Sequence, residues 1–377
     1  MLHDIRVIDL TMHLSGPYCC WLLASLGADV IKVERPDGGD PVREVGPFVY
    51  GESTYFASVN RNKRSVVIDL KSEQGKRDLA ALLETADVLV ENFRAGVLAR
   101  LGFDEKRLKE INPRLIYASI SGFGQNGPLS KRPAFDVVIQ GMSGMMSLTG
   151  PKGGDPTVMG ISVADISTGI FTALDIAAAL FQRERTGSPR RIDVAMLDCM
   201  FAMMENPVAR HLNAGEVPMR VGGRHPKITP FQPYPTSDGS IVVAADGDPN
   251  WRRMCDAMDI GHLAYDERFA TLERRVANYD ELEALLLPIF ASRTSAEWLD
   301  SLTRADVPCG PINGIPDIVK EDVVSHRKMI STVHRNDGAP FRFAASPIGL
   351  RGNRVDSPAP RLGEHTEEVL KQTRQTQ

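Results

Sequence analysis

The first third of the chain alternates short runs of β-branched and apolar residues with longer amphipathic stretches. The pattern predicts strands over residues 5–10, 29–34, 65–70, 87–90 and 115–119. Helices are predicted over residues 16–26, where a glycine and a proline open the pattern, and over residues 72–85. This alternation of strand and helix favours a parallel, doubly wound α/β sheet.

A longer apolar periodicity begins at residue 165 and ends near residue 185. Apolar side chains recur there at three- and four-residue steps, which is typical of one face of an amphipathic helix: Ile166, Ile170, Leu174, Ala177 and Phe181. A Gly-, Pro- and His-rich segment follows at residues 215–235, and a further strand pattern at residues 241–245 precedes several helical patterns.

These changes of pattern predict two domains, in agreement with a length of 377 residues. We expect a large domain made of residues 1–205 and 330–377, and a smaller α+β domain made of residues 206–329. The C-terminal helical pattern at residues 364–372 is expected to return to the large domain.

Composition and charge narrow the class of protein. Hydrophobic residues make up 42% and charged residues 24% of the chain, which is ordinary for a soluble globular protein. The net charge of −4 argues against a nucleic-acid partner, because such proteins usually carry a basic surface.

The five cysteines are odd in number and form no C-x-x-C pair, which favours a reducing compartment over a disulfide framework. The first ten residues carry charges where a signal peptide needs an apolar run. The longest apolar run, residues 170–181, is shorter than a membrane span and contains Asp175. We therefore expect a cytoplasmic protein with no membrane partner.

Gly122, Gly124 and Gly127 follow a predicted strand and match the dinucleotide-binding pattern G-x-G-x-x-G. That pattern requires a helix directly behind the glycines to hold the pyrophosphate. Here a segment with two prolines, residues 128–133, follows instead. We interpret the glycines as a turn.

Two other catalytic classes lack their motifs. The eight histidines are scattered with no H-E-x-x-H pattern and no paired cysteines, so no metal site is expected. No G-x-S-x-G motif is present, which disfavours a serine hydrolase of the α/β type.

Three basic residues lie just past predicted strands: Arg35, Lys71 and Arg94. In a doubly wound sheet, ligands bind outside the carboxyl ends of the strands, so these cations suit a phosphate-bearing ligand. A solvated rim of basic side chains explains the same spacing, and the pattern alone leaves both interpretations open.

Asp165 is a single carboxylate among small and apolar neighbours at the predicted start of a helix. Aspartate is a favoured N-cap residue. A helix N-terminus also favours an ionised carboxylate, the form that acts as a nucleophile. The residues around Asp165 do not decide between the two roles.

Across nearly its whole length the chain resembles the class III coenzyme A transferase family, also called the CaiB/BaiF family. The resemblance rests on short motifs that occur in the same order: residues 16–17 (GP), 26–36 (LGADVIKVERP), 62–65 (NKRS), 69–71 (DLK), 90–94 (VENFR), 121–128 (SGFGQNGP), 164–165 (AD) and 362–366 (LGEHT). It implies a Rossmann-like large domain, a small domain, and two chains threaded through each other as an interlocked homodimer.

The resemblance places the family's nucleophile on Asp165. Family positions that contact coenzyme A fall on Leu14, Ser15, Arg35, Ile68, Asp69, Leu70, Lys71, Asn92, Phe93, Arg94, Arg100, Pro133, Ala134, Phe135 and Asp136. Among them, Arg35, Lys71 and Arg100 are the expected partners of the phosphates. Some relatives have a lysine where this chain has Pro133, so Lys131 or Arg132 is expected to supply that charge. Coenzyme A is then a substrate, and no permanently bound cofactor is expected.

The family also contains racemases, which carry a histidine thirty positions before the aspartate. That position is Phe135 here, and a phenyl ring cannot accept a proton. The racemases' further glutamate falls on Asp248, a shorter acid. The resemblance therefore implies a CoA-transferase, with a racemase or a non-catalytic CoA-binding protein as the alternatives.

In the mechanism implied by the resemblance, Asp165 carries CoA as an aspartyl thioester between an acyl-CoA and a carboxylic acid. Residues 224–235 look like those of relatives that act on small dicarboxylic acids such as succinate. Arg224, His225 and Lys227 are candidates for pairing a second carboxylate. Residues 221–225 are either a mobile glycine flap over Asp165 or an interdomain linker.

Overall fold

The computed structural model describes residues 1–334, 340–348 and 356–375. Contacts divide the chain into two compact units. The first contains Met1–Met146, Val158–Val217 and Asp322–Gln377, and the second contains Ser147–Thr157 and Pro218–Glu321. This division assigns residues 206–217 and 322–329 to the first unit. The predicted domain boundaries at residues 205 and 330 stay predictions, and parts of the predicted C-terminal segment lie outside the described residues.

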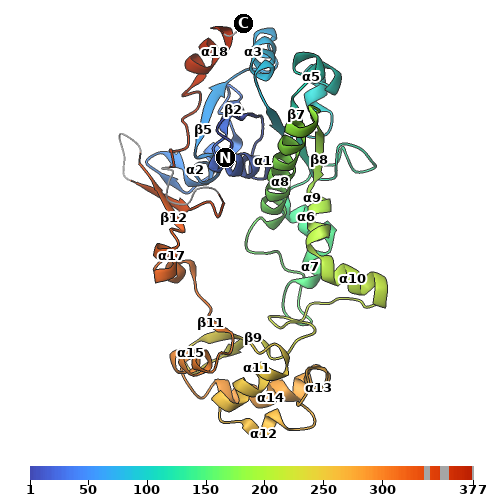
Figure 1. The fold of residues 1–377 in the computed structure, drawn as a ribbon, viewed down its shortest axis with the longest axis vertical. Coiled ribbons are helices and arrows are strands. Elements are labelled where there is room, and N and C mark those ends of the chain that lie inside the picture. Colours follow the sequence, from blue (N-terminus) through green and yellow to red (C-terminus); the bar gives the residue numbers. More distant parts are fainter. Residues whose placement is uncertain (335–339, 349–355, 376–377) are drawn as a thin grey trace. The chain divides into compact units, whose positions relative to one another are not determined.

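The first unit is built on a six-stranded parallel sheet in the order β5-β2-β1-β6-β7-β8 (Figure 1). Its strands are β1 (Arg6–Asp9), β2 (Asp29–Glu34), β5 (Lys63–Val67), β6 (Val88–Glu91), β7 (Ile116–Ser121) and β8 (Arg191–Ala195). The predicted parallel α/β sheet is confirmed. Strand β8 was not predicted, because its sequence RIDVA places two charged residues in a five-residue run. The order reverses between β1 and β6, which is the position where doubly wound sheets bind ligands.

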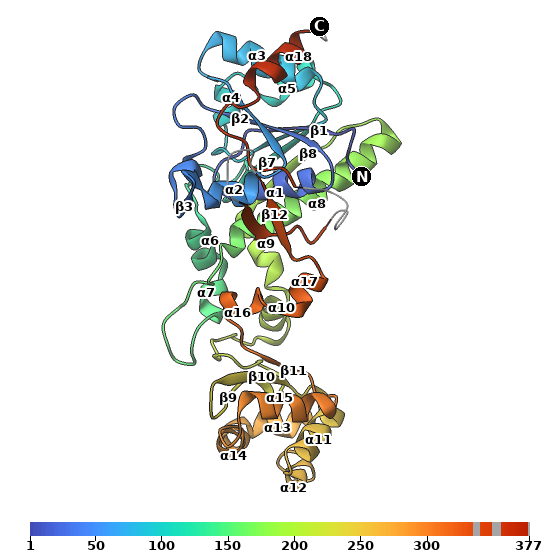
Figure 2. The same ribbon diagram turned by 90° about the vertical axis from the view of Figure 1, so that its left-hand side faces the viewer.

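Helices cover both faces of this sheet (Figure 2). Successive residues of β1 point to opposite faces: Val7 packs in a core with α1 (Ser15–Ser25) and α8 (Val163–Thr186). Ile8 packs in a second core on the other face, and the residues of this core include those of three longer helices. These are α3 (Glu73–Glu84), α5 (Glu105–Ile111) and the C-terminal α18 (Thr366–Gln375).

The remaining elements of the first unit are short or lie outside the sheet. They are α2 (Thr54–Asn60), α4 (Val97–Arg100), α6 (Asp136–Ser143), α9 (Met196–Met203), α10 (Glu205–Ala214), α17 (Asp322–His326), a 3₁₀ turn (Pro41–Glu44), and the strand pairs β3 (Phe48–Val49) with β4 (Glu52–Ser53) and β12 (Ile330–Val333) with β13 (Phe341–Ala344). Helix α7 (Met145–Leu148) crosses the division between the units.

The third predicted strand begins and ends earlier than expected. Residues 65–70 were predicted, whereas β5 spans Lys63–Val67. The strand includes Lys63 because its ammonium is buried and paired with Asp9 on β1, with Nζ 2.9 Å from Oδ2. Lys63 also donates to the side-chain oxygen of Asn60 and to the backbone oxygen of Pro17. A fully partnered lysine is therefore part of the sheet, where the sequence alone indicates a solvated strand end.

The C-terminal segment covers the free edge of β5. The backbone N–H of Gly363 donates to the Ser65 hydroxyl at 2.9 Å, and that of His365 donates to the Ser65 carbonyl at 2.9 Å. Val67 donates its backbone N–H to the Thr366 hydroxyl at 3.0 Å. These bonds satisfy backbone groups that an open edge strand would leave exposed, and they place α18 on the sheet as predicted.

Helix α8 is the long core helix of the first unit. Among the described residues it alone is long and apolar enough, by length and composition, to cross a membrane, but 56% of its apolar window is buried inside the protein. Such burial is typical of the core helix of a globular domain. Gly169 allows α8 to lie close to α1, because a Cβ there would be 2.8 Å from the backbone oxygen of Ser15.

The second unit has a three-stranded antiparallel sheet in the order β11-β10-β9. Its elements are β9 (Phe231–Pro235), β10 (Ser240–Ala244), β11 (Cys309–Pro311), α11 (Gly247–Ala257), α12 (Gly261–Ala264), α13 (Leu272–Ala277), α14 (Tyr279–Phe290), α15 (Ser295–Arg304) and α16 (Ile315–Ile318). Strand β9 was not predicted because it contains two prolines. It lies at an edge of the sheet, where proline is tolerated.

Candidate active site

Asp165 lies in the first turn of α8, three residues after the N-cap residue Ser162. The possibility that Asp165 is itself the N-cap is therefore wrong. The free backbone N–H of Ala164 is instead satisfied from another element, because Asp136, at the start of α6, accepts from it through Oδ1 at 2.8 Å. The helix start is thus anchored without the Asp165 side chain, which leaves that carboxyl group available for chemistry.

The carboxyl group of Asp165 meets the N-terminus of α1. Ser15, the first residue of α1, lies close enough for its hydroxyl and its backbone N–H to lower the pKa of Asp165 by hydrogen bonding. The close approach of the two helices at Gly169 makes this contact possible. The carboxylate is therefore stabilised by the first turns of two helices, α1 and α8.

Burial nevertheless dominates the ionisation of Asp165. Desolvation raises its pKa first, the negative charge of Asp136 raises it further, and the two Ser15 hydrogen bonds lower it. The net result is a pKa of about 6, above the ordinary value of 3.8. The two helix N-termini alone would lower the pKa of Asp165. Because its pKa is raised instead, the cost of removing water from the carboxylate outweighs their effect. Above pH 6 the carboxylate form still prevails.

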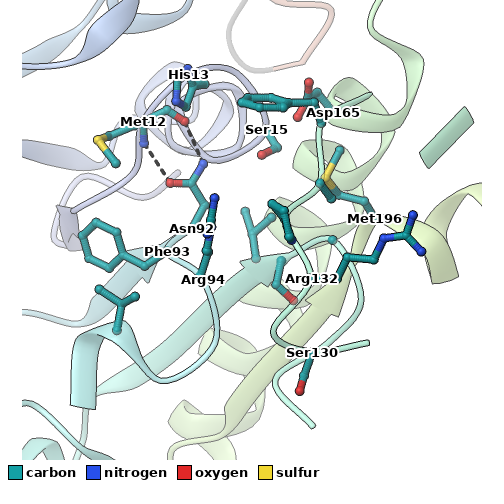
Figure 3. Close-up of a pocket in the computed structure, with 17 residues that line it drawn as sticks. Met12, His13, Ser15, Asn92, Phe93, Arg94, Ser130, Arg132, Asp165 and Met196 are labelled. Carbon is teal, nitrogen blue, oxygen red and sulfur yellow. Dashed lines mark hydrogen bonds between the residues drawn. The ribbon is translucent and has the colours of Figure 1, made fainter. Parts of the chain in front are cut away.

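A cavity of about 370 Å³ opens beside Asp165 (Figure 3). It is lined by seven of the residues at which the resemblance predicts coenzyme A contacts: Ser15, Asn92, Phe93, Arg94, Pro133, Ala134 and Phe135. Arg132 also lines it, whereas Lys131 does not, so Arg132 is the cation placed beside the proline at 133. In Figure 3, His13, Ser15 and Asp165 lie in the upper part of the view, and Ser130 and Arg132 lie in the lower part.

A second cavity, of about 230 Å³, is also lined by residues of the loops after β1 and β6. Five further predicted contacts line it: Arg35, Ile68, Asp69, Leu70 and Lys71. Arg35 follows the carboxyl end of β2 and Lys71 follows that of β5, as predicted from their spacing in the sequence. Arg35 is oriented by a hydrogen bond from its Nε to the Gly39 carbonyl at 2.9 Å. Met12 and Phe93 line both cavities.

Three predicted contacts line neither cavity. Leu14 is buried directly before α1, Arg100 is exposed at the end of α4, and Asp136 is engaged with the start of α8. The resemblance assigned Asp136 to the CoA contacts, and that assignment stays a prediction. The bonding of Asp136 to Ala164 and to Gln140, at 2.7 Å, gives it a structural role in positioning Asp165.

Asn92 also has a local role. Its Oδ1 accepts from the backbone N–H of Met12 at 2.8 Å, and its Nδ2 donates to the carbonyl of Met12 at 2.7 Å. This pair of bonds joins the loop after β1 to the loop after β6.

Two side chains near Asp165 were missed by the sequence analysis. His13 lines the same cavity and packs edge-on against Phe135, with ring centroids 5.8 Å apart. Tyr55 of α2 lies close enough for Asp165 to contribute to its raised pKa of about 12, after the larger effect of burial. No sequence motif indicates either residue, because His13 and Tyr55 lie on different segments of the chain, far in sequence from Asp165.

The acid that aligns with the racemases' glutamate is engaged elsewhere. In the second unit, Asp248 accepts from the buried guanidinium of Arg275 at 3.0 Å. Residue 135 presents a phenyl ring to the cavity, as the sequence indicates. Within the described residues, no group of three or more metal-ligating side chains is found.

The glycine segment at residues 221–225 lies in the second unit. Residues 221–224 line a cavity of about 290 Å³ together with Lys152 and Tyr279. The Arg224 guanidinium stacks on the Tyr279 ring at 3.9 Å from the centroid. Whether this segment closes over Asp165 stays a prediction.

Residues 2–366 match the model of CoA-transferase family III. The chain belongs to this family. The transferase is 40% identical over 378 residues to a succinate–glutarate CoA-transferase from Agrobacterium fabrum, an alignment that covers 98% of this chain and 94% of that protein. It is also 40% identical over 385 residues to a succinyl-CoA:mesaconate CoA-transferase from Haloarcula hispanica, with 98% of this chain and 95% of the other covered.

A solved structure supports the same assignment. A CaiB/BaiF family protein from Brucella suis aligns with the transferase at a TM-score of 0.87 and 38% identity, over 99% of each chain. The predicted family and class of activity are confirmed: the protein is a CoA-transferase, and CoA thioesters are its substrates.

The glycine motif at residues 122–127 is a turn, with Gly124 and Gly127 at positive φ and the next helix beginning only at Asp136.

Proposed function

We propose that Asp165 is the nucleophile through which the transferase moves CoA between two small dicarboxylic acids. The observation that carries this proposal is the position of Asp165, a carboxyl group of raised pKa that is held by Ser15 and lines the cavity beside the predicted CoA contacts. A desolvated carboxylate of higher pKa is a stronger nucleophile than one in water.

In the first half of the reaction, an Asp165 oxygen attacks the thioester carbonyl of the donor, and the carbon–sulfur bond breaks. This forms a mixed anhydride and CoA thiolate. The thiolate then attacks the carbonyl carbon of Asp165, the anhydride C–O bond breaks, and the donor acid leaves as its carboxylate. Asp165 is now an aspartyl-CoA thioester.

In the second half, the acceptor carboxylate attacks the aspartyl carbonyl and displaces CoA thiolate, which forms a second anhydride. The thiolate attacks the acceptor's acyl carbon and restores the Asp165 carboxylate. No net proton is consumed, because the acceptor's reacting carboxyl group enters as a carboxylate and the donor's leaves as one.

The Ser15 donors fit this scheme. When sulfur attacks the Asp165 carbonyl, negative charge develops on the aspartyl oxygen that already accepts from Ser15. The hydroxyl, the backbone N–H and the N-terminus of α1 then stabilise the tetrahedral intermediate without reorganisation. The scheme also requires that water be kept from the anhydride and the thioester, since either could hydrolyse.

Trapping with hydroxylamine tests the nucleophile. Protein incubated with succinyl-CoA and hydroxylamine should carry a hydroxamate on the peptide that contains Asp165. Asp198→Asn removes an exposed carboxylate from the first turn of α9 and should leave this labelling unchanged. Unmodified Asp165 under turnover would contradict the covalent scheme. Exchange of an α-proton with deuterated water, without any acceptor acid, would instead indicate a racemase.

Small dicarboxylic acids are the proposed acyl groups because the relatives described above act on succinate, glutarate or mesaconate according to their names. Arg94 and Arg132 give the cavity beside Asp165 positive groups that suit a second carboxylate. An acceptor screen with succinyl-CoA should show faster transfer to glutarate and mesaconate than to monocarboxylic acids of equal length.

The proposed assembly is the interlocked homodimer. Its support is the apolar face of α8: Ile170, Leu174 and Phe181 are 47%, 66% and 63% exposed in the single chain. A second copy would cover this face, and light scattering of Leu174→Asp against the unmodified protein tests that. A cytoplasmic location is proposed as well, since all five cysteines are free thiols and four are buried.

A further inference from the structure

A buried ion pair lies within hydrogen-bonding distance of the turn that carries Ser15. Asp9, at the end of β1, and Lys63, at the start of β5, have fully buried side chains, with Nζ of Lys63 2.9 Å from Oδ2 of Asp9. The two strands are not neighbours in the sheet, because β2 lies between them. Neither residue lines either of the two cavities described above, so ligand binding there does not account for the pair.

The pair holds both ends of the Ser15 arc, which is defined as residues 11–17. At one end, Oδ1 of Asp9 accepts from the backbone N–H of Thr11 at 2.9 Å and from its hydroxyl at 2.5 Å. At the other end, Nζ of Lys63 donates to the carbonyl of Pro17 at 3.0 Å. One ion pair therefore fixes the distance between the two ends of the arc and, with it, the place of Ser15.

The backbone of the Ser15 arc does not favour this shape by itself. His13 has a positive φ of 67°, a conformation that costs free energy and persists only where the surrounding structure imposes it. Gly16 lies so close to Thr11 that a Cβ at residue 16 would be 2.3 Å from the Cβ of Thr11. Leu14, the N-cap residue of α1, forms no side-chain cap hydrogen bond. Bonds from outside the arc must hold it, and the buried pair supplies them at both ends.

Lys63 also connects the arc to a further element near Asp165. Its ammonium donates to the side-chain oxygen of Asn60 at 2.9 Å, and Asn60 is the last residue of α2. Helix α2 carries Tyr55, whose pKa is raised to about 12 first by burial and then by the charge of Asp165. The three donors of the ammonium are thereby all used, one on β1, one on α1 and one on α2.

We propose that the Asp9–Lys63 ion pair positions Ser15 against Asp165, and that Lys63 is a positioning residue of the transferase. The inference rests on the proposed function, in which the hydroxyl and the backbone N–H of Ser15 stabilise the charge that develops on Asp165. The alternative is an ion pair that contributes to folding alone. Only a positioning pair would change the ionisation of Asp165 in a protein that still folds.

The ionisation of Asp165 reports the position of Ser15. Its pKa is set by burial, by the charge of Asp136 and by hydrogen bonding from Ser15, which lowers it. Replacing Asp9 and Lys63 together leaves the net charge unchanged, so a change in the pKa of Asp165 would reflect Ser15. The other charged or titratable groups near this carboxyl group are retained in the test: Tyr55, His13, Arg94 and Arg132.

The double variant Asp9→Asn/Lys63→Met tests the proposal. Removing both charges avoids the unpaired buried charge that either single variant would leave. Methionine donates no hydrogen bond to Pro17, so the arc should relax and the bonds from Ser15 to Asp165 should weaken. In the pH profile of kcat/KM, the fall on the acid side should shift by about 0.5–1 pH unit to higher pH. The value of kcat should fall about 10-fold to 100-fold.

The matched control is Arg183→Met/Asp87→Asn, which removes another buried ion pair of the first unit, with Nη2 of Arg183 2.7 Å from Oδ1 of Asp87. Arg183 lies on α8, as Asp165 does, but near the C-terminal end of that helix. This control should leave the acid-side fall in place. In both double variants, CoA binding measured by calorimetry should stay within about threefold of the unmodified protein, because none of the four residues lines either cavity.

A third variant combines Ser15→Ala with Asp9→Asn/Lys63→Met. If the ion pair acts through Ser15, the shift that the pair causes should be less than about half as large in this background. Two shifts that add in full would show that the pair acts by another route and would overturn the inference.

The remaining outcomes separate the inference from the proposed function. An acid-side fall that stays in place in folded Asp9→Asn/Lys63→Met would mean that the pair is only structural. If this variant loses its circular dichroism spectrum, Thr11→Val replaces it, since valine has the shape of threonine but no hydroxyl to donate to Asp9. Its shift should have the same direction and about half the size, and no shift would again contradict the inference. Absence of a hydroxamate on Asp165 of the unmodified protein would instead refute the proposed function.

Discussion

Asp165→Asn should stabilise the folded protein while abolishing transfer. The folded protein raises the pKa of Asp165 from 3.8 to about 6, mainly because the group is buried. A shift of about two units, at 1.36 kcal/mol per unit, means that the ionised carboxylate costs the fold about 3 kcal/mol. Asparagine has nearly the same shape and retains an oxygen that accepts from Ser15, but it has no charge to desolvate.

The sign of this effect depends on pH. Because the folded-state pKa lies above the unfolded value, the folded protein binds the extra proton between about pH 4 and about pH 6. Stability from this group is present at low pH and is lost as pH rises through that window. The gain from Asp165→Asn should therefore be close to zero near pH 4 and about 3 kcal/mol above pH 7, or about 5 °C in melting temperature.

Urea titrations of both proteins across this pH range measure the difference directly. Asp198→Asn is the matched control, since it removes an exposed carboxylate that favours the N-terminus of α9. It should lower stability by about 0.3–1 kcal/mol, the opposite sign. An Asp165→Asn protein that is less stable than the original above pH 7, or a gain that does not vary with pH, would refute the reasoning.

Three further variants test the surroundings of Asp165. Ser15→Ala removes a donor that lowers the pKa of Asp165. In the pH profile of kcat/KM, the fall on the acid side should therefore shift by about one pH unit to higher pH. Ser25→Ala, in the same helix, should leave the profile unchanged. Asp136→Asn removes a charge that raises this pKa, so the acid-side fall should move to lower pH, and an unchanged fall would argue against the charge effect. Gly169→Ala places a Cβ 2.8 Å from the Ser15 carbonyl oxygen. It should lower the free energy of unfolding in urea by about 1–3 kcal/mol and reduce the rate of CoA transfer. Unchanged stability and unchanged transfer would contradict the close packing of α1 and α8.

Local patterns in the sequence predicted most of the sheet. Strand β2 has the predicted bounds, and the predicted helix over residues 72–85 differs from α3 by its two capping residues. These elements follow from alternation and periodicity over a few residues. Strand β9 and the early start of β5 could not be predicted, because a sheet edge tolerates its prolines and the distant Asp9 partners Lys63.

In the candidate site, too, some residues could be predicted from the sequence and others could not. The motif order predicted Asp165 as the nucleophile and fifteen CoA contacts, twelve of which line the two cavities at the carboxyl ends of the strands. The sequence did not reveal that Asp136 anchors the start of α8 or that His13 enters the cavity.

The sequence by itself determined the elements, the family and the residue expected to react, because each depends on short-range patterns. Only the tertiary structure decided that Ser15 lies beside Asp165, that burial raises the pKa of this carboxyl group, and that Asn92 bonds to the backbone of Met12. These relations join residues about 80 to 150 positions apart. They arise from strand order and from the close approach of two helices, and the same burial that creates the cavity sets the energy of its charge.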